Sequence, residues 1–305
     1  MATEGEPHSK MKAGAIFGLL KQTVNEWLDD RGFTRSASLS YYTVFSIAPL
    51  LLIAVAVAAL VVGKEAVTGE LHEQLDSMVG DEGASAIQEM MKSASKPGRG
   101  VLASILGVTM LLVGATGAFV ELQDTLNDMW GVDKDKASGV FGFIRARILS
   151  LAMVLVIAFL LLVSLLVSTA LSAFGKYAST AFPGWQLALQ VANIVVSFVV
   201  ITALFAAIYK VLPNTKVAWR NVWLGAALTS VLFAFGKLLI GLYLGKSSAS
   251  SSYGAAGSFA VLLIWINFSS MILFFGAEFT QVLSRARGDH QLPKKSPSKA
   301  APAEA

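Results

Sequence analysis

The fold is decided by the twenty residues SFAVLLIWINFSSMILFFGA, which run from Ser258 to Ala277 and lead into Glu278. None of them carries a charge. At about 1.5 Å rise per residue, a helix of this length spans about 30 Å, the thickness of the hydrocarbon core of a bilayer. The stretch therefore predicts a transmembrane helix.

Polar side chains on this predicted helix share one side. At about 100° per residue, Asn267, Ser270, Glu278 and Gln281 fall within a single arc, which we name the polar stripe. An amide or carboxylate exposed to lipid costs several kcal/mol, so we expect the stripe to face protein or water. The stripe is the first candidate site, as part of a translocation path or a gate.

The composition is that of an integral membrane protein. Of the 305 residues, 55% are hydrophobic and 14% are charged, against about 25% charged in soluble domains. The absence of cysteine excludes disulfides, thiolate metal sites and cysteine nucleophiles. The net charge of +4 comes from basic residues beside apolar segments, where membrane orientation explains them first. We therefore expect membrane lipids, and no nucleic acid, as partners.

The apolar segments predict an all-α polytopic membrane protein with six transmembrane helices. We expect a cytoplasmic N-terminus with an amphipathic interfacial helix at residues 1–40, a membrane domain at 41–283 and a disordered cytoplasmic tail at 284–305. The segment that follows the first ten residues is amphipathic, so we expect no cleavable signal peptide. The expected spans are about residues 41–62, 100–120, 148–171, 187–209, 222–244 and 257–282.

Two features outside the spans complete this prediction. The amphipathic helix lies either on the membrane surface or against the inner end of the bundle, and both arrangements remain open. Residues 64–98 are acidic and carry two apolar stripes at helical spacing, which predict a two-helix cap. Most of the 24 Lys and Arg residues lie on the side of the termini, so we expect both termini in the cytoplasm and an extracytoplasmic cap.

Proline and glycine mark bends and close contacts in the first two spans. Pro49 removes a backbone hydrogen bond, which predicts a kink. In the second span, Gly107, Gly114 and Gly117 share one face, and small residues so aligned let another helix approach closely. The second span is therefore expected to lie at the centre of the bundle.

Charged residues next to the spans form further candidate sites. Glu121, Asp124 and Asp128 share a face on the cytoplasmic side, either as a cation site or gate, or as a charged surface that pairs with arginines. Lys237 is the only Lys or Arg deep in a predicted span, and it either lines a cavity with Ser230 or extends its amine outward. Glu278 is either a gating carboxylate or an ion pair at the helix end, with Arg145, Arg147, Lys216 or Arg220 as possible counter-charges.

The sequence gives little support for an enzymatic activity. The three histidines, His8, His72 and His290, are expected on two sides of the membrane and in the tails, so they cannot form a metal cluster or a catalytic triad. No phosphate-binding Walker motif occurs. We expect no catalytic residues, no metal and no cofactor.

Five stretches resemble the YihY/BrkB family of bacterial inner-membrane proteins. The resemblance implies a six-helix cell-membrane protein, and it adds Tyr253 to the candidate path residues. Many family members have Leu-Asn after the glutamate, where this chain has Phe279 and Thr280. The stretches are ASLSYYTVFSIAPLLL (37–52), ATGAFVELQDTLNDMWGV (115–132), LPNTKVAWRN (212–221), SSYGAAGSFAVLLIW (251–265) and FFGAEFTQVL (274–283).

The function that these observations favour is transport. We expect a transporter-like protein that moves a small or amphiphilic envelope molecule, such as a lipid or its precursor, along the second, fifth and sixth spans. The alternative is an envelope scaffold in which the stripes only pack helices. A ribonuclease activity, implied by an old label in the resembling family, is third, because the sequence holds no catalytic cluster.

Overall fold

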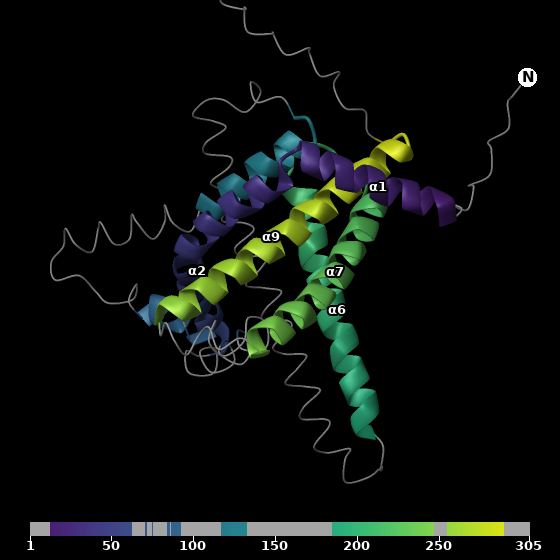
Figure 1. Ribbon diagram of the computed structural model, residues 1–305. Coiled ribbons are helices and arrows are strands. Elements are labelled where there is room, and N and C mark those ends of the chain that lie inside the picture. Colours follow the sequence, from purple (N-terminus) through teal and green to yellow (C-terminus); the bar gives the residue numbers. More distant parts are fainter. Residues whose placement is uncertain are drawn as a thin grey trace, which may run out of the picture.

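The computed structural model describes residues 13–62, 71, 75, 84–85, 87–92, 117–132, 185–246 and 255–289. Residues 117–129 form a short helix, and the described part contains no β-strand, so the predicted all-α class is confirmed for these residues. Five longer helices make up most of this part (Figure 1): α1 (Ala13–Asp29), α2 (Gly32–Val62), α6 (Trp185–Val211), α7 (Trp219–Lys246) and α9 (Ala255–Ala286).

Three of the described helices are long and apolar enough to cross a membrane. The candidate spans are Ile194–Val211 in α6, Trp219–Ile240 in α7 and Phe259–Ala286 in α9, and they match the predicted fourth, fifth and sixth spans. The predicted first span, 41–62, is helical and forms the second part of α2. Most of the predicted second span, with Gly107 and Gly114, and all of the third lie outside the described residues. Six spans thus stay a prediction.

The helix α9 is the central element of the described bundle. It contacts α1, α2 and α7, and in Figure 1 it runs as the yellow-green helix between them. Val44 of α2 and Ile240 of α7 belong to one buried cluster with Leu262 of α9. Leu19 of α1 packs near the other end of α9, against Val282 and Leu283. The last of the described helices therefore contacts elements from the early and the late part of the sequence.

The contact between α7 and α9 is closed by glycines that face threonines. A Cβ atom at Gly225 would collide with the side chain of Thr280, and one at Gly276 would lie 2.6 Å from Tyr209 Oη as well as against Thr229. The threonine hydroxyls donate to the backbone of their own helices: Thr229 Oγ1 to Gly225 O and Thr280 Oγ1 to Gly276 O, both at 2.7 Å. Small residues thus let the two backbones approach closely.

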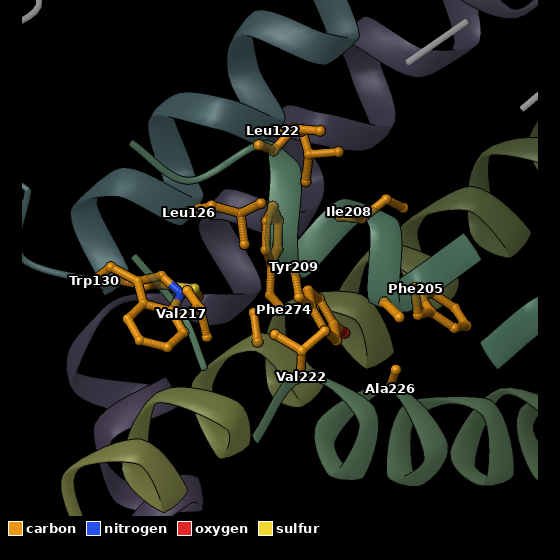
Figure 2. Packing of buried hydrophobic residues seen from close by; sticks show 14 of the residues in the cluster. Leu122, Leu126, Trp130, Phe205, Ile208, Tyr209, Val217, Val222, Ala226 and Phe274 are labelled. Atoms are coloured by element: carbon orange, nitrogen blue, oxygen red, sulfur yellow. The ribbon is translucent and has the colours of Figure 1, made fainter. Parts of the chain in front are cut away.

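A buried aromatic core lies where four elements meet. Figure 2 shows Leu122, Leu126 and Trp130 of the 117–132 segment, which point toward Tyr209 of α6 and Phe274 of α9. The Tyr209 hydroxyl donates to Leu273 O at 2.7 Å and lies 3.0 Å from Thr229 Oγ1. Because these polar atoms are paired inside an apolar core, they fix one arrangement of the helices.

The 117–132 segment also holds the connection between α6 and α7. Gln123 Nε2 donates to Leu212 O at 2.9 Å, and the Asn214 backbone N–H donates to Asn127 Oδ1 at 2.7 Å. These contacts join two of the stretches quoted above, 115–132 and 212–221. The docking of one segment on the other therefore gives a structural reason for the presence of both stretches in the sequence.

Described residues of the predicted cap pack against α2, α7 and α9. Leu75, Ala84 and Ile87 are buried in the cluster that contains Val44 and Ile240. Leu71, Met90 and Met91 pack against the same cluster. The two apolar stripes therefore serve as packing surfaces, while the side of the membrane on which the cap lies stays a prediction.

Candidate functional site at the junction of α1 and α9

Three of the four residues of the polar stripe are buried inside the protein. Ser270 is 5% exposed, and Glu278 and Gln281 are each 1% exposed, while Asn267 is half-buried. The prediction that the stripe faces away from lipid is therefore confirmed for these three. Ser270 Oγ donates to Ile266 O of its own helix at 2.8 Å. Glu278 and Gln281 instead reach toward other elements.

Glu278 faces acidic groups of α1. Glu26, Asp30 and Arg285 lie near enough to its carboxyl group to act on it electrostatically. The second oxygen, Oε2, is buried without a hydrogen-bond partner among the described residues. A carboxyl group in this position is not needed to pack α9, because it leaves part of its hydrogen-bonding capacity unused.

The base nearest to this pair belongs to α9 itself. Arg285 Nη2 donates to Glu26 Oε2 in an ion pair, and Gln22 Nε2 donates to Glu26 Oε1 at 2.9 Å. Lys216 and Arg220, which the sequence suggested as counter-charges for Glu278, are not among the groups that act on it. Arg145 and Arg147 lie outside the described residues. Among the described residues, Arg285 is the base that acts on Glu278, and the choice between a gating carboxylate and an ion pair at the helix end stays open.

Further buried polar atoms without a partner among the described residues belong to residues of α1 and α9. Gln281 Nε2 donates to Met129 O at 3.2 Å, but Gln281 Oε1 has no partner in the described part of the chain. Trp27 Nε1 and Arg285 Nε are also buried and unpaired there. We call Glu26, Trp27, Glu278, Gln281 and Arg285 the α1–α9 junction. It combines two unused donors and two unused acceptors, an uncommon concentration inside a protein.

The position of α1 resolves the choice that the sequence left open. Leu19, Thr23 and Trp27 are buried, so one face of α1 packs on the bundle. Phe17 and Leu28 are exposed, which leaves a second apolar face directed outward. The structure thus favours the helix docked against the bundle, and the outward face has the apolar character expected of an interfacial helix.

Of the carboxylates that follow the second predicted span, Asp128 forms an ion pair. Asp128 Oδ2 pairs with Arg35 Nη1 of α2 at 3.0 Å, and Arg35 Nε also donates to Asp30 O at 2.8 Å. Asp124 is exposed and Glu121 is half-buried. Within the described residues, no three His, Cys, Asp or Glu side chains gather in a way that would hold a metal ion. Asp128 therefore follows the arginine-pairing alternative.

Lys237 and Ser230 have different surroundings although they share a helix face in sequence. Ser230 is 1% exposed, and it accepts a hydrogen bond from Thr202 Oγ1 of α6 at 3.0 Å. Lys237 is exposed. The structure therefore does not bring these two residues into one cavity, and the exposed amine agrees with the outward alternative.

The remaining candidates are placed only in part. Gly117 is half-buried next to Tyr42, and α2 continues as one helix through Pro49. The kink at Pro49 stays a prediction. Tyr253, Gly107 and Gly114 lie outside the described residues.

A second polar network joins the cytoplasmic ends predicted for α7 and α9. Asn221 Nδ2 donates to Asp289 Oδ2, and Arg287 Nη1 donates to Asn221 Oδ1, each at 2.8 Å. Partial burial and the neighbouring Arg220 lower the pKa of Arg287 from its usual value, while Asp289 opposes this effect. Because these groups satisfy one another, they act as a structural tie.

Glu26 and Arg285 are junction residues that sequence reasoning missed. Glu26 stands among the polar residues of an amphipathic helix, where a solvent-facing role is the usual one. Glu26 and Arg285 are 259 positions apart, and a single sequence carries no signal for such a contact. One signal in the sequence could have found Glu26: it follows Leu19 by seven residues, which places it on the apolar face of the predicted helix, and in the structure it is partly buried.

Comparison with known proteins gives a consistent family. Residues 23–301 match the family described as virulence factor BrkB. A UPF0761 membrane protein of Verminephrobacter eiseniae is 28% identical over 84% of this chain and 59% of that protein. One of Teredinibacter turnerae is 27% identical over 90% of this chain and 62% of that protein.

The chain thus spans about three fifths of the length of these curated relatives. No solved structure matches it. The family match covers most of the sequence, and three described helices have the length and composition of membrane spans. The chain is a membrane protein that belongs to the BrkB family.

Proposed function

We propose that this protein is transporter-like and moves a small or amphiphilic envelope molecule, such as a lipid or its precursor, across a bacterial inner membrane. Both termini lie in the cytoplasm, and the path runs along the second predicted span, α7 and α9. The protein acts without catalytic residues, metal or cofactor. Its partners are membrane lipids and the transported molecule, and nucleic acid is not among them.

The observation that carries the proposal is the pair of unused acceptors on α9. Glu278 Oε2 and Gln281 Oε1 are buried in a helix that is apolar enough to cross a membrane, yet neither has a partner among the described residues. Polar groups that only pack helices are normally satisfied, as Thr229 and Thr280 are. Ionisable groups kept inside membrane segments commonly serve a substrate or ion path.

Cysteine accessibility tests the proposal in the protein as it exists. The chain contains no cysteine, so single cysteines at Asn267, Ser270, Ser230 and Lys237 need no engineered background. Membrane-impermeant thiol reagents are applied from either side in vesicles. Exposed positions on each predicted side, Lys216→Cys and Glu89→Cys, report the sidedness of the reagent.

For a transporter, we expect the buried position Ser270 to react and its accessible side to change when candidate lipids or ions are added. Protection of Asn267, Ser270 and Ser230 under every condition, with both controls reactive, would contradict the proposal. The scaffold would then be favoured. Its specific support is the α7–α9 contact, where Thr280 and Thr229 fill the space beside Gly225 and Gly276.

A further inference from the structure

The outward face of α7 begins with basic and aromatic side chains. Lys216 precedes the helix, and Trp219, Arg220 and Trp223 follow in its first two turns. All four side chains are exposed. The candidate membrane span of α7 starts at Trp219, and Trp is enriched at the boundary between lipid tails and headgroups. This end of α7 therefore lies at the level of the lipid headgroups.

Arg287 of α9 adds a third base at the same level. The candidate span of α9 ends at Ala286, so Arg287 is the first residue beyond it. Arg287 Nη1 donates to Asn221 Oδ1 at 2.8 Å, and Asn221 directly follows Arg220 on α7. In agreement with this geometry, partial burial and the neighbouring Arg220 lower the pKa of Arg287 from its usual value. Two helices thus bring bases together at the end of the bundle that is predicted to be cytoplasmic.

This surface carries an excess of positive charge. Asp289 is the acid that acts on Arg287, and its Oδ2 accepts a hydrogen bond from Asn221 Nδ2 at 2.8 Å. Within the described residues, Lys216 and Arg220 form no ion pair. Three bases therefore stand against one acid, which leaves charge that an anion can neutralise. We name this group the α7 entry surface, which consists of Lys216, Trp219, Arg220, Trp223 and Arg287.

Trp219 is held in its outward position by α6. Lys210 Nζ lies 5.4 Å from the centroid of the Trp219 ring, and it also donates to Val217 O. A cation over the face of an aromatic ring is attracted to it. The indole ring therefore has a defined place although it is 55% exposed. A side chain that is already ordered loses less entropy when a ligand binds to it.

An exposed apolar stripe continues from Arg220 along α7. At about 100° per residue, Leu224, Val231, Phe235 and Leu238 fall with Arg220 into an arc of about 60°. All four apolar side chains are exposed. A base at the headgroup level followed by an apolar stripe matches a phospholipid, whose phosphate lies at the interface and whose acyl chains enter the membrane. A free phosphate ion would make no use of the stripe.

We propose that the α7 entry surface and the apolar stripe bind an anionic phospholipid, with its phosphate at Lys216, Arg220 and Arg287 and an acyl chain along the stripe. The inference goes beyond the proposed transport, because this lipid stays on the outward face of α7 whether or not a solute moves through the bundle. A zwitterionic lipid is held less tightly, because its headgroup has no net charge to offset the three bases. Since the bases belong to two helices, the bound lipid also strengthens the tie between α7 and α9.

The experiment measures which lipid lies next to α7. The chain has no cysteine, so Leu224→Cys places a single fluorophore in the stripe of the full chain. The labelled protein is reconstituted in phosphatidylcholine vesicles that contain a small fraction of spin-labelled phosphatidylglycerol or, in parallel, spin-labelled phosphatidylcholine. The ratio of quenching by the two probes reports the local enrichment of the anionic lipid. We expect severalfold enrichment at Leu224 that decreases with added salt, because ions screen the attraction.

Matched variants locate the enrichment on the surface. Phe45→Cys on α2 is the control label, because Phe45 is exposed one turn inside the predicted first span, and its ratio should stay near one. In the Leu224→Cys chain, Arg220→Gln should lower the enrichment by up to about fivefold, since a base near the membrane surface contributes roughly this factor. Lys21→Gln removes an exposed charge from α1 and should leave the enrichment unchanged. Arg287→Lys should lower it less than Arg287→Gln, because the charge is kept.

Three results would overturn the proposal. One is equal quenching by the two probes at Leu224. Another is equal enrichment at Leu224 and Phe45, which would assign the effect to the net charge of the whole chain. The third is loss of the enrichment when inorganic phosphate replaces chloride at constant ionic strength, which would assign the surface to a free anion. If Arg287→Gln fails to fold, the exposed positions decide through Arg220→Gln and Lys216→Gln.

Discussion

The polar groups on the two sides of α9 differ in whether they have hydrogen-bond partners. Toward α7, the hydroxyls of Tyr209, Thr229 and Thr280 all have hydrogen-bond partners, and glycines bring the backbones together. Toward α1 and the 117–132 segment, Glu278 and Gln281 each keep a buried acceptor without a partner among the described residues. Satisfied groups stabilise a fixed contact, whereas unsatisfied ones cost stability and persist where function requires them. The α7–α9 contact is thus structural, and the α1–α9 junction is the candidate site.

The largest effect is expected when a glycine at the α7–α9 contact is replaced by a larger residue. We expect Gly276→Val to destabilise the protein by about 3 kcal/mol, because the new side chain would press on Thr229 and Tyr209 in a packed core. Thermal unfolding in detergent measures the effect. The control is Gly18→Val on α1, where a Cβ meets nothing within 4 Å and stability should hardly change. Equal effects at both positions would show that the α7–α9 contact is loose.

A smaller loss is expected from removing one hydroxyl in the core. Tyr209→Phe leaves Leu273 O without its donor and breaks the contact with Thr229, which should cost about 1–2 kcal/mol. Tyr41 is 60% exposed, so Tyr41→Phe serves as the matched control with an effect near zero. Denaturant or thermal unfolding of both variants gives the comparison. A neutral Tyr209→Phe would mean that the hydroxyl is paired without stabilising the bundle.

The opposite sign is expected at the junction. Glu278→Gln removes a buried carboxyl group whose Oε2 has no partner among the described residues, so the stability of the variant should equal or exceed that of the wild-type chain by up to about 1 kcal/mol. Thermal unfolding measures this difference. If Glu278→Gln loses stability, as Tyr209→Phe does, Glu278 belongs to the structural groups and the comparison fails.

The weakest expected effect is that of the neighbouring ion pair. The side chains of Arg35 and Asp128 are 28% and 21% exposed, so water and salt screen their attraction. A double-mutant cycle with Arg35→Met and Asp128→Asn should give a coupling energy of about 0.5 kcal/mol that falls with added salt. A coupling several times larger, insensitive to salt, would extend the junction to include this pair.

Periodicity predicted the direction of the polar stripe, but it could not predict what the stripe would meet. The burial of Ser270, Glu278 and Gln281 follows from their common face on an apolar helix. Whether Glu278 lies near Glu26 depends on how α1 packs on α9, which is a tertiary contact. Two of the stretches that resemble the family contain Gln123 and Asn214, and only the structure shows that these segments dock on each other.

Two residues on one helix face can have different surroundings, because a neighbouring helix covers only part of the length of that face. Ser230 and Lys237 lie two turns apart on one face of α7, and the sequence left open whether they line one cavity or Lys237 extends outward. Ser230 is covered by α6 through Thr202, whereas Lys237 is exposed. A helical wheel treats a face as uniform along its length. The point at which two helices diverge is set by their crossing geometry, which the sequence of one helix does not contain.

The central place of α9 has a consequence for biosynthesis. Glu26 and Arg285 are separated by 259 positions, so α1 is made long before the helix that completes its binding surface. At a synthesis rate of about 5–20 residues per second, this interval lasts about 13–50 s. During that time the buried side chains Leu19, Thr23 and Trp27 have no α9 to pack against. We therefore expect the apolar face of α1 to rest at the membrane surface or on the insertion machinery until α9 has been made.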